Sequence, residues 1–284
     1  MSDQAVSTAT GWVCVSCRAR TPLESDVCAG CGRPFGLGLA EDRGPLWART
    51  REVGLVVKEL VVVAALLLAW RLMGKVALLG TTGYAHGLSV WHLERALHLP
   101  SELAVQREVL PYAGFVRGLD WFYLSAHILG LFVFLVWLYR RDRDVYYRWR
   151  NIVVAFTGLS LLIQLVPVAP PRLLPQLGFV DTALRDHTSV YGPSTGDTAG
   201  QFASIPSVHV GWAVLIAIAV VMVCTSRLRW LIVAYPLATV YVVVATGNHF
   251  WLDGVAACVL LAAVLGVDQW WYSNRRSTAR TSQS

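Results

Sequence analysis

The stretch VHVGWAVLIAIAVVMVCT, residues 208–225, contains no acidic residue, lysine or arginine. Five further, largely apolar runs lie near residues 53–73, 120–139, 151–168, 229–247 and 252–272. A helix needs about 20 apolar residues to cross a bilayer, so the six runs predict six membrane-spanning helices. The first of the six is the weakest, because Lys58, Glu59 and Arg71 interrupt it. Long charged side chains near the ends of a span can pair or reach the interface.

The composition agrees with a polytopic membrane protein. Of the 284 residues, 55% are hydrophobic and 15% are charged, and the mean hydropathy is +0.51; an ordinary soluble domain is about 25% charged. The 12 Trp and 10 Tyr residues fit aromatic belts at the two membrane interfaces. We interpret the net charge of +6 as topology signals and contacts to anionic lipid head groups, and we expect no nucleic-acid partner. The predicted fold class is an all-α membrane protein, a six-transmembrane-helix bundle.

Arginine-rich segments indicate the orientation of this bundle. One forms a predicted loop between the second and third runs, at residues 140–150, one lies between the fourth and fifth runs, at 227–229, and one follows the sixth run, at 275–280. With six spans, all three segments fall on one side, which the positive-inside rule makes cytoplasmic. We therefore expect the plasma (inner) membrane of a bacterium, with both termini cytoplasmic. The connection at 169–207 and the turn at 246–248 then lie outside.

Two short motifs stand where the fourth and sixth spans begin: Pro206-Ser207-Val208-His209 and His249-Phe250-Trp251-Leu252-Asp253. Both therefore face the same, outer interface. Residues i and i+4 share one face of a helix, so Asp253 can hydrogen-bond the His249 imidazole. The other ring nitrogen then remains available as nucleophile or base, and His209 can serve as the acid. These roles suit phosphoryl transfer through a phosphohistidine; the alternative is that each histidine is an interfacial helix cap.

These motifs resemble the second and third signatures, PSGH and HxxxD, of the type-2 phosphatidic acid phosphatase superfamily. Of its first signature, KxxxxxxRP, the chain keeps an arginine within Pro170-Pro171-Arg172, while Leu165 stands at the lysine position. Val243 replaces an arginine expected six residues before the nucleophilic histidine. These departures resemble the inositol phosphorylceramide synthase (inositolphosphotransferase) branch, and the loop context resembles its bacterial members. The resemblance covers residues 85–275 and implies a six-helix bundle with its active site at the helix ends.

The resemblance implies a role for each motif residue. His249 would attack phosphorus, and Asp253 would orient and charge-stabilise its imidazole. His209 would protonate the leaving oxygen and later activate the acceptor. Arg172 would bind the phosphoryl oxygens, helped by the Ser207 hydroxyl and by backbone N–H groups at the start of the fourth helix. The alternative for Arg172 is an interfacial anchor.

Other polar residues on the outer side are further candidates. Asp181 either contacts the substrate or caps a turn or helix. Tyr123 and His127 share a helical face at the start of the second span and could line the substrate cleft. Their alternative roles are an interfacial tyrosine and a hydrogen-bonded core histidine. Arg185 and His187, in the same loop as Asp181, could add positive charge for phosphate binding.

The segment Leu88 to Leu99 has apolar residues at helical spacing, with Glu94 and Arg95 on the polar side. This pattern is typical of an amphipathic helix that lies in the membrane interface.

The first 50 residues contain Cys14, Cys17, Cys28 and Cys31, a CxxC-x10-CxxC pattern. Four such thiolates can bind one tetrahedral Zn²⁺, and four Cys ligands leave no open position for catalysis, so the zinc would be structural. The alternatives are a disulfide pair or unrelated thiols, but a reducing cytosol disfavours disulfides. Trp12-Val13-Cys14 resembles the Ran-binding-protein type of zinc finger, although Thr21 replaces its usual asparagine. We therefore expect a cytosolic protein partner instead of RNA.

We expect three parts in the chain. Residues 1–50 would form a cytoplasmic four-Cys zinc ribbon and linker, and residues 51–272 the six-helix lipid phosphatase/phosphotransferase membrane domain. Residues 273–284 are polar and would form a disordered cytoplasmic tail.

The expected function is cleavage of a lipid phosphoester at the extracytoplasmic interface through phospho-His249, with no cofactor required for catalysis. The branch resemblance favours head-group transfer of a phosphoinositol type. The first alternative is a simple phosphatidic acid or isoprenyl phosphate phosphatase. The second is a catalytically weak membrane scaffold that recruits a cytosolic partner through its zinc ribbon.

Overall fold

The structure, a computed structural model, describes residues 6–8, 11–13, 19–21, 25, 27–32, 61, 65, 68–69, 72, 82–186 and 200–281. The chain divides into two compact units, Met1–Leu60 and Val61–Ser284. Each unit is described by itself.

The first unit contains a three-stranded antiparallel sheet with the strand order β1-β2-β3. The strands are Val6–Thr8, Gly11–Val13 and Arg20–Thr21. Cys28 and Cys31 follow in a turn that ends at Gly32, whose φ of +69° is one that glycine adopts without strain. Cys14 and Cys17 lie outside the described residues.

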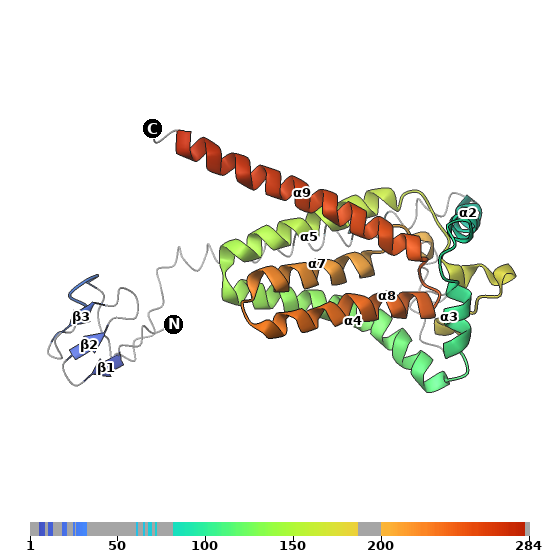
Figure 1. Ribbon diagram of the computed structural model, residues 1–284, viewed down its shortest axis with the longest axis horizontal. Coiled ribbons are helices and arrows are strands. Elements are labelled where there is room, and N and C mark those ends of the chain that lie inside the picture. Colours follow the sequence, from blue (N-terminus) through green and yellow to red (C-terminus); the bar gives the residue numbers. More distant parts are fainter. Residues whose placement is uncertain are drawn as a thin grey trace. The chain divides into compact units, whose positions relative to one another are not determined.

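Long helices run side by side in the second unit (Figure 1). They are α4 (Ala113–Arg141), α5 (Arg143–Ile163), α7 (Val208–Val223), α8 (Ala234–Ala245, preceded by the 3₁₀ helix η4, Arg227–Val233) and α9 (Trp251–Thr281). Their contact faces form one hydrophobic core: Leu138 of α4, Phe156 of α5, Leu215 of α7 and Leu261 of α9 are each at most 1% exposed.

The outer faces of these helices are also apolar, as expected beside lipid. Three described helices are long and apolar enough to cross a membrane, at 113–141, 227–245 and 251–271, and α7 is a shorter apolar helix. On α4, Ile128 and Phe132 are more than 60% exposed, and such exposed apolar surface marks a membrane or protein contact. The first predicted span, 53–73, lies largely outside the described residues.

The basic segment at 140–150 is helical and not the loop that the sequence predicted. α4 continues through Arg141, and α5 begins at Arg143. Asp142 between them is extended, and its carboxylate accepts the backbone N–H groups of Asp144 and Val145. This N-cap lets one helix end and the next begin without a loop. At the other end of the chain, α9 continues to Thr281, through most of the segment that the sequence predicted to be disordered.

Short helices lie across the end of the bundle at which α8 ends and α9 begins (Figure 1). They are α2 (Thr82–Ala96), α3 (Glu102–Val109), η1 (Pro171–Leu173), η2 (Pro175–Leu177), α6 (Thr182–Arg185) and η3 (Gly200–Phe202). α2 packs closely on the connection after α5, because the Ala169 amide donates to the Gly83 carbonyl oxygen at 2.9 Å.

The predicted amphipathic helix corresponds to α2, but its polar side faces the protein. Glu94 is fully buried, whereas Leu93 and Leu97 are 51% and 54% exposed. Leu93 and Leu97 thus point away from the bundle, which suits contact with lipid, whereas Leu88, Val90 and Trp91 of α2 pack against a buried cluster of the protein.

Candidate active site at the histidine end of the bundle

His249 and Asp253 meet where α9 begins. The turn before α9 contains Gly247 with φ +68°, and the amides of Asn248 and His249 both donate to the Val243 carbonyl oxygen. His249 Nδ1 lies 3.0 Å from Asp253 Oδ2, and the Phe250 amide donates to the same carboxylate oxygen at 3.0 Å. Asp253 is fully buried, so its carboxylate is held in one orientation against the imidazole, as the i,i+4 spacing predicted.

A third donor to Asp253 comes from a residue that the sequence did not indicate. The Ser204 hydroxyl donates to Asp253 Oδ2 and lies 3.4 Å from His249 Nδ1. Ser204 is also buried. It belongs to the loop before α7, and no motif or periodicity distinguishes it from the neighbouring polar residues.

The second ring nitrogen of His249 is buried. His249 is 4% exposed, and its Nε2 is buried with no hydrogen-bond partner among the described residues. The His209 ring lies beside it, with 5.5 Å between the ring centroids. Within the same described part of the chain, His209 Nδ1 is also buried without a partner. Two imidazoles with unused nitrogens therefore lie next to each other in a buried site.

Ser207 positions His209. It is the N-cap of α7, and its hydroxyl accepts the Val210 amide at 3.4 Å. Its own amide donates to the Asp253 carbonyl oxygen at 3.1 Å, so the starts of α7 and α9 are joined directly.

α4 contributes Tyr123 and His127 to the same cluster. The Tyr123 ring stacks on His209 with centroids 4.3 Å apart, and the His127 ring meets His209 edge-on at 4.1 Å. A cavity of about 10 Å³ is lined by Phe122, Tyr123, His127, His209, Thr239, Val242 and Val243. Such a volume holds about one water molecule.

Arg172 lies beside the turn that precedes His249. Its amide donates to the Gly247 carbonyl oxygen at 2.8 Å, and its Nε donates to Asn248 Oδ1 at 2.9 Å. Its Nη1 lies 2.7 Å from Asp181 Oδ2 and 3.5 Å from Gln201 Oε1. The guanidinium is therefore fixed next to the turn that precedes His249, and Asp181 pairs with its charge.

The family of the chain follows from a sequence comparison that covers this site. Residues 88–267, more than half of the chain, match the PAP2 superfamily. The chain belongs to the PAP2 superfamily. No curated protein and no solved structure matches it. Membership supports a phosphoester-acting membrane enzyme of the lipid phosphatase type.

Asp181 and Arg185, two of the further candidate residues, both make contacts within this PAP2 chain. Asp181 caps α6 through the Leu184 amide, at 2.9 Å, in addition to its pairing with Arg172. Arg185 pairs with its neighbour Asp186 at 2.9 Å, and this hydrogen bond raises the pKa of the Arg185 guanidinium. His187 lies outside the described residues.

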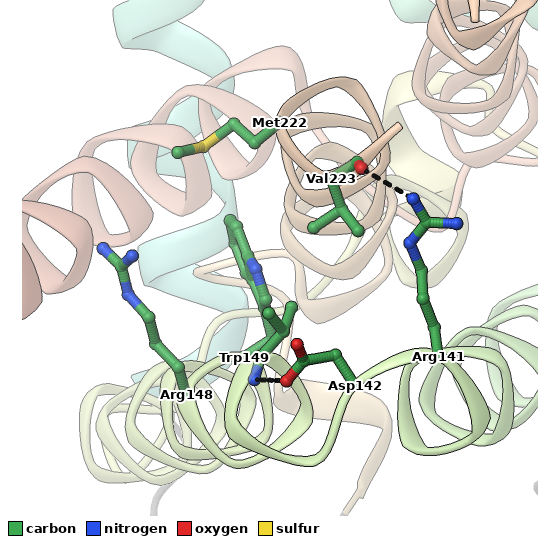
Figure 2. A pocket seen from close by; sticks show the side chains of 7 residues that line it. Arg141, Asp142, Arg148, Trp149, Met222 and Val223 are labelled. Carbon is green, nitrogen blue, oxygen red and sulfur yellow. Dashed lines mark hydrogen bonds between the residues drawn. The ribbon is translucent and has the colours of Figure 1, made fainter. Parts of the chain in front are cut away.

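A larger cavity lies at the opposite end of the PAP2 bundle. It has a volume of about 650 Å³ and is lined by Arg141, Asp142, Val145, Arg148, Trp149, Met222 and Val223. Figure 2 shows Arg141 and Arg148 on either side of it, with Trp149 and Asp142 between them. Arg141 donates to the Val223 carbonyl oxygen, and Arg148 pairs with Asp268. None of the lining residues is a histidine, cysteine or serine.

Proposed function

We propose that the protein is an integral membrane lipid phosphotransferase that forms a phosphohistidine on His249. The observation that supports this most directly is the pair His249–Asp253, with Nδ1 held at 3.0 Å and Nε2 unpartnered among the described residues, beside His209. An imidazole fixed through one nitrogen presents the other as a nucleophile.

The proposed reaction has two steps. His249 Nε2 attacks phosphorus, the P–O bond to the leaving group breaks, and the leaving oxygen takes a proton from the protonated His209 imidazole. In the second step, neutral His209 accepts the proton of an acceptor hydroxyl, whose oxygen attacks phosphorus as the P–N bond breaks. Asp253 stabilises the positive charge that develops on His249, and Arg172 stabilises the phosphoryl oxygens.

The acceptor is proposed to be an alcohol, so that a head group of the phosphoinositol type is transferred to a lipid. The burial of His249 supports this, because a site closed to bulk water lets a bound alcohol compete for the phosphoenzyme. A phosphatidic acid or isoprenyl phosphate phosphatase would use the same histidines with water as the acceptor.

One assay separates these outcomes. Purified protein in detergent is given phosphatidic acid, an isoprenyl phosphate, or phosphatidylinositol with a lipid alcohol, and free phosphate and head-group exchange are followed in parallel. We expect exchange that disappears in His249→Ala. His249-dependent phosphate release would assign a phosphatase, and full turnover by His249→Ala would overturn the mechanism. If neither phosphate release nor head-group exchange is found with any of these substrates, the scaffold alternative is favoured.

We also propose that Cys14, Cys17, Cys28 and Cys31 bind one structural Zn²⁺. The turn at Cys28 supports this: the Gly30 amide donates to Cys28 Sγ at 3.4 Å, and the Gly32 amide donates to the Cys28 carbonyl oxygen at 2.9 Å. Amide donors to sulfur favour a thiolate, the form that binds zinc. Elemental analysis of the full-length protein should find one zinc per chain, and Cys28→Ser together with Cys31→Ser should remove it. The exposed face of this module would bind a cytosolic protein.

A further inference from the structure

Glu94 reaches the start of α9 from a distant helix. Its side chain is fully buried, and its Oε1 accepts the Leu252 amide at 2.8 Å. Leu252 precedes Asp253 in the first turn of α9. The Glu94 carboxyl group therefore caps the helix that carries Asp253, one residue away from it.

Glu102 brings α3 to the same place. It is the first residue of α3 and is also fully buried. Arg95 Nη2 lies 3.2 Å from Glu102 Oε2 and also donates to the Pro100 carbonyl oxygen at 2.9 Å. That carbonyl oxygen accepts Trp251 Nε1 at 2.9 Å as well, so α2, α3 and α9 converge here.

If Glu94 and Glu102 were both deprotonated, each would keep a buried carboxylate oxygen with no hydrogen-bond donor among the described residues. We call Glu94 and Glu102 the carboxyl pair. Glu94 Oε2 and Glu102 Oε1 are both buried and find no donor in the described part of the chain, and a hydrogen bond to Glu102 is among the causes that raise the pKa of Glu94. One proton placed between these oxygens satisfies both, as in carboxyl pairs that cannot ionise together.

The charges around the carboxyl pair support the same assignment. Arg95 from α2 neutralises one carboxylate, Glu102, while Asp253 from α9 adds a further negative charge. Burial, followed by the hydrogen bond to Glu102, raises the pKa of Glu94 to about 9. At neutral pH Glu94 is therefore the protonated member.

We propose that Glu94 is a positioning residue for the active site: the proton it shares with Glu102 holds α2 and α3 against the start of α9 and so keeps Asp253 and His249 aligned. The effect on turnover rests on the proposed phosphohistidine function. When the proton is lost, two adjacent buried carboxylates repel each other and Asp253, and the start of α9 loses its cap. Activity and stability should both fall as the pH approaches 9.

The sign of the stability effect follows from the two pKa values. In the unfolded chain Glu94 has an ordinary pKa of 4.5, and in the folded protein about 9. The folded protein keeps a proton that the unfolded chain releases, so this contribution is complete below about pH 4.5 and is lost as the pH rises through about 9. Glu94→Gln keeps an acceptor for Leu252 and a donor for Glu102 and has no proton to lose.

The test compares Glu94→Gln and Glu94→Ala with Glu108→Gln, an exposed glutamate of α3, as the matched control. Full-length protein in detergent is assayed for head-group exchange and for thermal unfolding from about pH 6 to about pH 10. We expect Glu94→Gln to match wild-type kcat at neutral pH and to lose the alkaline fall in both kcat and unfolding midpoint. Glu94→Ala should lower kcat roughly tenfold with a smaller change in KM. Glu108→Gln should behave as wild type throughout.

Two results would overturn the proposal. One is an alkaline fall in Glu94→Gln equal to that of the wild type, and the other is equal damage by the Gln and Ala variants at neutral pH. If the wild type has no His249-dependent turnover, the proposed function is wrong, but this result does not decide the proposal for the carboxyl pair. The unfolding midpoints of the same variants then still decide whether the carboxyl pair shares a proton.

Discussion

At the scale of the residue, the proposed mechanism depends most on the single charge of Asp253. Asp253→Asn keeps the size of the side chain but removes that charge and favours the wrong tautomer of His249. We expect kcat to fall by about 10³ to 10⁴, as when the carboxylate of a histidine-based triad is neutralised, with little change in KM. Asp268→Asn is the control, because Asp268 lies on the same helix but pairs with Arg148 at the other end. Near-normal kcat in Asp253→Asn would contradict the assigned role.

Arg172 tests the phosphate-binding role at the same scale. Its guanidinium holds Asn248 through Nε and Asp181 through Nη1 at fixed angles. A lysine keeps the charge but cannot hold both partners, because it lacks the planar fork. We therefore expect Arg172→Lys to lower kcat/KM roughly 10- to 100-fold while the protein remains folded. Steady-state kinetics with a thermal unfolding control measure this, and a variant with unchanged kcat/KM would make Arg172 only an interfacial anchor.

At the scale of the element, the contact between α5 and α7 determines where His209 lies. Gly211 is two residues after His209, and a Cβ placed there would lie 2.0 Å from Phe156 Cζ. Phe156 is fully buried, so its ring cannot move aside. Gly211→Ala should push α7 away from α5, destabilise the protein by about 1–3 kcal/mol and displace His209.

A second glycine provides the control for this prediction. A Cβ added at Gly158, on α5, would meet no atom within 4 Å, so Gly158→Ala should be neutral or gain up to about 1 kcal/mol from helix propensity. The measurement is the unfolding midpoint of both variants in the same detergent, together with their kcat. Equal stability of the two variants would contradict the close approach of α5 and α7.

Elements defined by local sequence were predictable, and those defined by distant contacts were not. The apolar runs located α4, α7, α8 and α9, because lipid-facing helices need apolar residues along their length. The His249–Asp253 contact was also local, since Asp253 lies in the first turn of α9 and its carboxylate reaches back to His249 just before the helix. The burial of Glu94 could not be predicted, because its partners Glu102 and Leu252 come from two other helices. The tight turn from α4 to α5 at Asp142 was missed because clustered arginines resemble a loop.

At the scale of the whole molecule, the two ends of the bundle differ in chemistry. The histidine end gathers the proposed catalytic residues, and the other end gathers arginines such as Arg141, Arg148 and Arg229 around the end of α7. By the positive-inside rule, we propose that the end of the bundle around Arg141, Arg148 and Arg229 lies in the cytoplasm. The histidine end would then face outward, where lipid substrates of the outer leaflet meet it.

Accessibility to a membrane-impermeant thiol reagent tests this orientation. Glu108→Cys places a thiol on α3 at the histidine end, and Asp144→Cys places one at the arginine end; both native side chains are exposed. The native cysteines are first replaced by serine or alanine, and the background must retain His249-dependent turnover. In intact bacterial cells we expect labelling of Glu108→Cys alone, and labelling of Asp144→Cys only after permeabilisation. The reverse pattern would place the histidines in the cytoplasm and would require a substrate in the inner leaflet, since His249 and His209 lie at the same end as α3.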